Sequence, residues 1–175
     1  MKTKRSNRGV GLIEVLVAVL VASIGLLGIA STLLTTTRTT TSSYLRQVAV
    51  QDAYNMVDRM RSNYTAATAA GGAYTTTLAD KAASTAPSTD CSSTSCNASD
   101  MAAYDVWQWK TLLSKSLPNG EGAITVASGT NNTATITVEV QWDDSAAQAA
   151  LTCHNASCNA GTSSNTATYT VVTAL

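Results

Sequence analysis

The stretch RGVGLIEVLVA, residues 8–18, decides the fold of this chain, because it joins a basic segment to a long apolar run. Four Lys and Arg residues precede the run, and its 25 residues, from position 10 to position 34, contain one charge, Glu14. A helix of that length spans roughly 37 Å, enough to cross a hydrocarbon core of about 30 Å. A charge deep in a bilayer costs on the order of 2.5–3.5 kcal/mol, and less near the interface. We therefore infer that Glu14 has a functional role.

This N-terminus resembles the leader and cleavage site of type IV prepilins: a short basic leader ends in Gly9, and glutamate is the fifth residue of the apolar helix that follows. The resemblance implies that a prepilin peptidase cleaves between Gly9 and Val10 and that the new N-terminus, Val10, is methylated. It also implies that Glu14 meets the N-terminal amine of a neighbouring subunit, a pair in which each charge offsets the burial cost of the other. The family usually has Phe or Met and then Thr after the cut, where this chain has Val10 and Gly11.

Charge and length divide the chain into three parts. Basic residues before the helix place the N-terminus in the cytoplasm and the remainder outside. Together with the cleavage and filament packing that the resemblance implies, we expect a leader (1–9), a transmembrane and filament-core helix (10–34) and a periplasmic head (35–175). A secretory signal peptide is the alternative, but the run is too long and contains Glu14. Without the leader, seven basic and 11 acidic side chains remain, which gives no general electrostatic footprint for nucleic acid.

The four cysteines form two pairs of equal spacing, Cys91 with Cys96 and Cys153 with Cys158. An even count after a membrane segment predicts disulfides in an oxidising compartment. Three pairings are possible, and the matched spacing favours the two local ones, each contributing about 2 kcal/mol. Zinc bound by these thiols and His154 is the alternative that we do not favour.

Hydrophobic periodicity extends the first helix to Ser62. After a Thr-rich stretch, apolar residues recur at three- and four-residue steps between positions 45 and 60 and predict an amphipathic half in which the Met and Tyr residues contact a core. Residues 65–98, rich in Ala, Thr, Ser and Gly, predict a long loop that buries little and that Tyr74 and Leu78 attach to the rest of the fold.

A second helix is predicted over about 100–116, with Trp109, Leu112 and Leu113 facing inward and the segment 118–120 ending it. Period-two alternation then predicts strands at 123–126, 135–142 and 167–173, with a solvated strand end at 143–144 and a loop over 145–166. The expected fold is α+β: a long N-terminal helix packed on a small antiparallel sheet of three or four strands, with one more helix and disulfide-tied loops.

Several downstream segments are similar to those of PilV-type minor pilins: 44–46, 53–63, 103–105, 109, 117–120 and 140–144. This resemblance implies a minor pilin that initiates, assembles or modifies type IV pili, with effects on twitching motility and adhesion. The implied partners are other minor and major pilins, prepilin peptidase, the inner membrane and the pilus assembly machinery. The implied location is the inner membrane as a single-pass precursor, then the pilus at the cell surface.

We predict no enzyme, cofactor or metal site, because the chain has one histidine and lacks metalloprotease, nucleophile-elbow, P-loop and dinucleotide-binding patterns. Two alternatives are kept. A type II secretion pseudopilin belongs to the same class, and a membrane-tethered periplasmic enzyme or ligand-binding module requires a concave site with clustered titratable groups.

Overall fold

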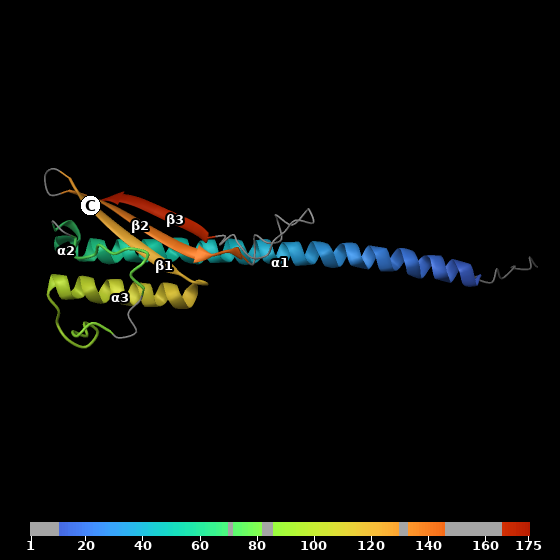
Figure 1. Cartoon of the computed structure of the whole chain (residues 1–175), viewed down its shortest axis with the longest axis horizontal. Helices are drawn as coiled ribbons and strands as arrows, with labels where there is room; N and C mark the ends of the chain where they lie inside the picture. The colour runs from blue at the N-terminus through green and yellow to red at the C-terminus, as the bar shows by residue number, and fades with distance from the viewer. Residues whose placement is uncertain (1–10, 70–71, 82–85, 130–132, 146–165) are drawn as a thin grey trace, which may run out of the picture.

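The structure, a computed structural model, describes residues 11–69, 72–81, 86–129, 133–145 and 166–175. Its elements are α1 (Leu12–Ser62), α2 (Tyr64–Thr68), α3 (Ala98–Ser116), β1 (Glu121–Ser128), β2 (Ala134–Asp143) and β3 (Thr166–Ala174). Figure 1 shows α1 extending far beyond a head in which α1 and α3 lie beneath the sheet. The fold is therefore the expected α+β arrangement of a long N-terminal helix, a small antiparallel sheet and a further helix.

The helix α1 contains 51 residues, which corresponds to a length of roughly 76 Å, and it ends at Ser62 as predicted. Its two halves differ in their surroundings. Every residue from 12 to 41 is exposed, whereas the second half buries one stripe: Ala49, Asp52, Ala53, Met56, Val57 and Met60. That stripe has the three- and four-residue spacing that places side chains on a single helix face.

A Thr-rich section joins these halves without breaking α1. The hydroxyls of six threonines, at positions 35–37 and 39–41, each donate to the carbonyl four residues earlier. Threonine is a modest helix former, and these bonds satisfy its hydroxyl within the helix itself. The helix therefore continues through a polar stretch that makes few contacts with the head.

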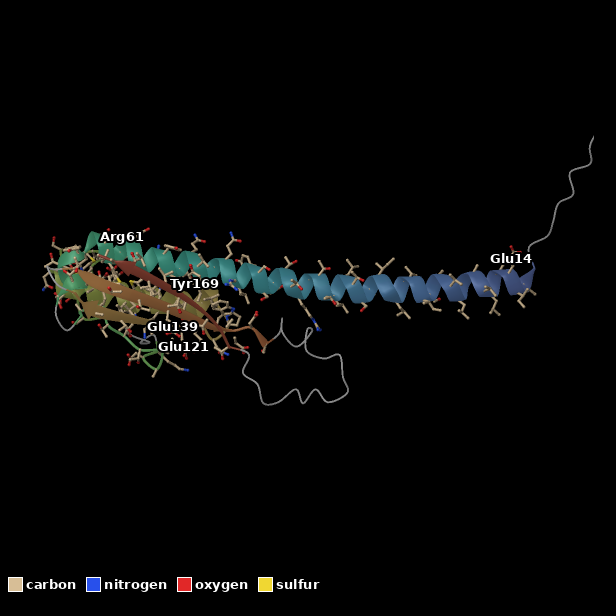
Figure 2. All side chains as sticks on the ribbon, turned by 90° about the horizontal axis from the view of Figure 1, so that it is seen from above. Glu14, Arg61, Glu121, Glu139 and Tyr169 are labelled. Atoms are coloured by element: carbon tan, nitrogen blue, oxygen red, sulfur yellow. A yellow bond between two sulfur atoms is a disulfide. The ribbon has the colours of Figure 1, made fainter. Side chains whose placement is uncertain are left out.

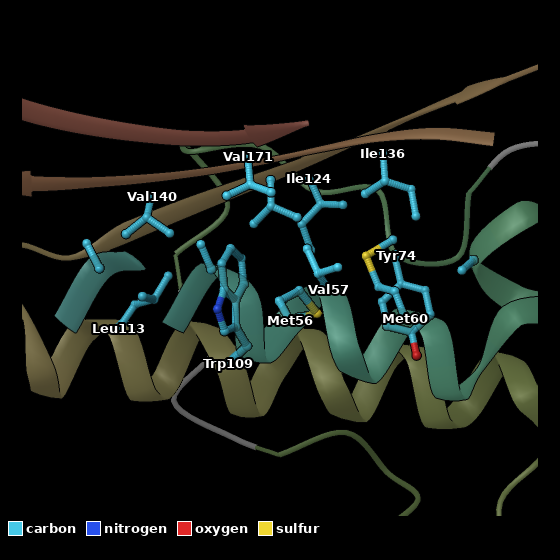
Figure 3. Packing of buried hydrophobic residues seen from close by; sticks show 14 of the residues in the cluster. Met56, Val57, Met60, Tyr74, Trp109, Leu113, Ile124, Ile136, Val140 and Val171 are labelled. Atoms are coloured by element: carbon cyan, nitrogen blue, oxygen red, sulfur yellow. The ribbon is translucent and has the colours of Figure 1, made fainter. Parts of the chain in front are cut away.

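The sheet has the order β1-β2-β3, with both pairs antiparallel. Strand β2 alternates as predicted: its even-numbered residues, Ile136, Val138, Val140 and Trp142, are buried, and the residues between them are more exposed. The turn before β1 needs a left-handed residue, which Asn119 supplies with φ 49°. Figure 3 shows the core between this sheet face and the two helices, with Met56, Val57 and Trp109 at its centre.

Helix α3 covers the predicted range and begins at Ala98, directly after its capping residue Asn97, whose side chain accepts from the Asp100 N–H at 2.8 Å. Trp109 and Leu113 are fully buried, as predicted. The prediction for Leu112 is wrong, since 40% of it is exposed. Position 112 lies about 100° around the helix from position 113 and therefore faces away from the core.

The prediction that residues 65–98 form a loop burying little is wrong in part. Helix α2 occupies its beginning, and Thr76 forms an isolated bridge with Ile124 of β1, whereas the full burial of Tyr74 agrees with its predicted attachment to the fold. The expectation that all Tyr residues of α1 contact the core is also wrong, since Tyr44 and Tyr54 are exposed. Only tertiary packing decides these positions, because aromatic and small residues fit both a core and a surface.

Candidate assembly site

The apolar half of α1 is the clearest candidate for function. It projects from the head, and Figure 2 places Glu14 at the end of α1 that is far from the sheet. Glu14 lies in the first turn of α1, where its N–H donates to the Gly11 carbonyl at 2.9 Å. A carboxylate there is favoured by the positive end of the helix dipole. The arrangement presents one negative charge at the tip of an otherwise apolar rod.

This helix is also the membrane candidate. Among the described residues, α1 is the one helix whose length and composition suffice to cross a membrane. No part of its apolar stretch is buried against the rest of the structure. Gly9 and Val10, the predicted cleavage pair, lie outside the described residues. An exposed apolar surface of this extent is unfavourable in water, so lipid or other protein is expected to surround it.

A disulfide closes one loop of the head. Cys91 and Cys96 are bonded, with their Cα atoms 5.6 Å apart. Within the loop Asp90 Oδ1 accepts from the Ser92 hydroxyl and N–H at 2.6 and 2.9 Å, and these bonds lower the pKa of Asp90. Cys153, Cys158 and His154 lie outside the described residues, so their predicted roles stay predictions.

The predicted solvated strand end at 143–144 is wrong for Asp144, which is buried at the junction between the head and the projecting part of α1. Ser42 of α1 donates to Asp144 Oδ2 at 2.8 Å. Within the described part of the chain, Oδ1 is buried without a hydrogen-bond partner. The sequence gives no sign of this contact, because it joins residues 102 positions apart. It attaches the sheet to α1 at the point where the helix leaves the head.

A second polar cluster, also missed by sequence reasoning, joins α1 to α3. Asp105 Oδ1 accepts from Arg59 Nη1 at 3.0 Å, and Oδ2 accepts from the Tyr74 hydroxyl at 2.8 Å. Asn63 Nδ2 donates to that hydroxyl oxygen at 3.1 Å. Burial raises the pKa of Tyr74 above its ordinary 10.0. Buried polar groups are stable when bonded in this way, so the cluster fixes how the two helices and the 72–81 segment meet.

Lys110 is the buried cation of the head. Its Nζ donates to the carbonyls of Thr77, at 2.7 Å, and Asp80, which fastens the 72–81 segment to α3. Burial lowers the pKa of Lys110, while the carboxylates of Asp80 and Glu121 act in the opposite direction. A half-open pocket of about 440 Å³ lies beside these groups. Within the described ranges, no cluster of three or more His, Cys, Asp or Glu residues could hold a metal ion.

The fold and this helix define the class first: an α+β protein of pilin-like fold whose apolar N-terminal helix extends from a small head. Two family models then match the chain. The model described as type IV pilin Tt1218 matches residues 34–107, and the prokaryotic N-terminal methylation motif matches residues 4–30. Together they support a type IV pilin. Searches of curated proteins and of solved structures each returned no match.

These matches bear on role and place. The type IV pilin family is structural rather than enzymatic, and likeness to that family implies interaction with other pilins and processing by prepilin peptidase. The methylation motif and the long apolar helix fit a membrane-anchored pilin.

Proposed function

We propose that this chain is a PilV-type minor pilin that takes part in initiating, assembling or modifying type IV pili. The observation that carries the proposal is the apolar half of α1, which is exposed along its whole length and has one carboxylate in its first turn. Such a surface suits both a bilayer and a bundle of neighbouring helices. The minor role draws on the similarity of the head segments to PilV-type pilins.

The proposed life of the subunit has two stages. Prepilin peptidase cuts after Gly9, and the amine of Val10 is methylated. Residues 10–34 hold the subunit in the inner membrane while the head, 35–175, lies in the periplasm, and the helix then enters the pilus. In that bundle Glu14 faces the N-terminal amine of a neighbour, and the attraction is strong because water is excluded. Oxidation of the second cysteine pair, Cys153 with Cys158, belongs to the periplasmic stage.

Cleavage is tested by replacing Gly9 with a bulky residue. Because a bulky side chain at the last leader position obstructs the peptidase, we expect the precursor to accumulate, seen as a larger band and an intact leader by mass spectrometry. Normal processing and normal piliation of Gly9→Leu would contradict the leader assignment.

The assembly contact is tested by Glu14→Gln, which removes the charge and keeps the size of the side chain. Ser23→Ala is the matched control, because Ser23 is polar, lies in the same apolar half and satisfies its hydroxyl on the Val19 carbonyl. We expect the subunit in sheared pili to fall about tenfold or more for Glu14→Gln at an unchanged membrane level, since a loss of about 1.4 kcal/mol is tenfold. The control should retain wild-type incorporation.

Two results would redirect the proposal. Normal incorporation of Glu14→Gln would remove the charge pair from the mechanism. Deletion that leaves pili intact and abolishes secretion by a type II system would assign the chain to the pseudopilins instead.

A further inference from the structure

The outer strand of the sheet has an edge that no other described strand covers. Among the described residues, strand β3 pairs only with β2, and Figure 1 shows it as the outermost strand of the head. Leu175 and Ala134 exchange both backbone hydrogen bonds at 2.9 Å, which sets the phase of this antiparallel ladder. Residues 167, 169, 171 and 173 therefore direct their N–H and C=O groups toward β2. Thr168, Thr170 and Val172, which alternate with them, direct theirs outward.

These outward groups have no hydrogen-bond partner elsewhere in the described ranges of the chain. The side chains of Thr168, Thr170 and Val172 are exposed as well, and Val172 is 64% exposed. The whole strand, TATYTVVTA, has neither a charge nor a proline. Charges and prolines are the devices by which proteins prevent strand edges from pairing, and β-branched residues favour pairing. The edge of β3 is thus ready to accept another strand.

The opposite edge of the same sheet is covered. Thr76 N–H donates to the Ile124 carbonyl at 3.0 Å, and Ile124 N–H donates to the Thr76 carbonyl at 2.9 Å. The 72–81 segment that supplies Thr76 is itself fastened to α3 by Lys110. Within the described residues, the head thus covers β1 at Ile124 and leaves the outer edge of β3 unpaired.

We propose that the edge of β3 is a docking site for an extended, uncharged segment of a different polypeptide chain, which adds to the sheet as a fourth strand. Backbone groups of Thr168, Thr170 and Val172 supply the hydrogen bonds, as in strand addition generally. Their side chains select β-branched or aromatic neighbours, because such cross-strand pairs stabilise a sheet and a buried unpaired charge does not.

A second copy of the chain fits this edge poorly. Strand β3 runs in the same direction as α1: Tyr169 lies beside Tyr54, and Thr173 accepts from Arg61 further along both elements. Antiparallel pairing of β3 with its copy would point the two α1 helices in opposite directions, which excludes anchorage in one membrane. Parallel pairing with β1 of a copy meets Thr76 at Ile124, and parallel pairing with β3 of a copy turns that copy over, which places its α1 on the opposite face of the joined sheet. The first of these exclusions rests on the proposed function, whereas the open edge does not.

A peptide probe tests the edge directly. A capped peptide with the sequence of residues 166–174 has no membrane anchor, so it is free to pair antiparallel with β3. When its central Thr faces Thr170, threonines and valines lie opposite each other across the two strands. Two N-methylated forms are compared. One carries methyl groups at the positions of Ala167 and Val171, on the edge that does not dock. Its control carries them at the positions of Thr168 and Val172, on the docking edge.

Binding is measured by amide NMR of the full chain in detergent micelles. With the first peptide we expect saturable shifts of the amide signals, centred on Thr168, Thr170 and Val172. The control peptide should bind with an affinity lower by about tenfold or more. Val172→Lys should weaken binding by a similar factor. Thr125→Lys should not, although it places the same charge in the same row of the sheet, since Thr125 pairs with Thr137 and Thr137 with Val172.

Equal binding of both peptides, or none, would overturn the docking site. Val172 is exposed, so Val172→Lys should fold, and Thr168→Lys serves as a second variant of the same design. If two copies of full-length Thr170→Cys in one nanodisc formed a disulfide with each other on oxidation, the assignment to a different chain would be overturned. Processing and Glu14 variants are read separately, so failure of this site leaves the proposed function standing.

Discussion

Replacing Asp105 by alanine tests whether the buried polar cluster holds the head on α1. Asp105 is 8% exposed and accepts from the guanidinium of Arg59 at 3.0 Å and from the hydroxyl of Tyr74 at 2.8 Å. Removing one member of a buried charged pair costs about 3–5 kcal/mol. The Arg59 side chain is 28% exposed, and water recovers part of that cost, so we expect about 2–4 kcal/mol.

The assay is urea unfolding of the full chain in detergent, followed by tryptophan fluorescence, because Trp109 is fully buried and its indole N–H donates to the Asp52 carbonyl at 2.9 Å. Tyr74→Phe should cost about 1.5 kcal/mol, the value of a hydrogen bond to a charged acceptor. In the double variant with Asp105→Ala the losses should not add, since both remove the same hydrogen bond.

The dependence on pH provides an independent check. The pKa of Tyr74 is raised in the folded state above its ordinary 10.0, so the unfolded chain loses this proton first. Stability from the neutral phenol is complete below pH 10.0 and decreases as the pH rises above it. Tyr74→Phe should remove that part of the alkaline loss.

Asp58→Ala is the matched control, because Asp58 forms an exposed pair with Arg61 at 3.1 Å. An exposed pair contributes about 0–1 kcal/mol, so this variant should unfold close to the wild type. If Asp105→Ala were no more destabilising than Asp58→Ala, or if the effects of Asp105→Ala and Tyr74→Phe were fully additive, the cluster would not hold the helices together.

Three further changes are predicted. Gly122→Ala should lower the free energy of unfolding in urea by about 1–3 kcal/mol, because the added Cβ would lie 2.3 Å from the buried ring of Trp109. Gly28→Ala is its control and should leave the head unchanged, because nothing lies within 4 Å of the added Cβ. Asp52→Asn should raise the melting temperature at pH 7, since burial raises the pKa of Asp52 and its charged form destabilises the fold; the gain should shrink as the pH falls, and a constant gain would refute this reasoning. The double replacement of Cys91 and Cys96 by serine should lower the free energy of unfolding by about 2 kcal/mol, checked against reduced wild-type protein.

Local pattern was sufficient wherever a segment had one strong periodicity. The apolar run and the amphipathic stripe fixed α1 to its end at Ser62, and alternation fixed β2. Local pattern did not identify the hydrogen-bond partners of the buried polar side chains. Tyr74 lies in a stretch of Ala, Thr and Gly, and nothing near it in the chain shows that Asn63 and Asp105 would bond its hydroxyl.

Some residues of the candidate site were predictable from the sequence, and others were not. Glu14 was predictable because a charge in an apolar run is conspicuous without any knowledge of what surrounds it. Asp144 was not, because an acidic pair after a strand ordinarily faces water, and only the approach of Ser42 buries it. The open edge of β3 was likewise invisible, since strand order is a property of the assembled sheet.

The sequence by itself determined that a basic leader, an apolar helix with one carboxylate and a small α+β head follow one another, because each depends on residues close together in the chain. The tertiary structure alone decided which polar groups are buried in the head, that Thr76 bridges to Ile124 at one edge of the sheet and that the outer edge of β3 is unpaired among the described residues. The physical reason is that burial and strand pairing arise between segments distant in sequence, and their free energy depends on what each group meets after folding.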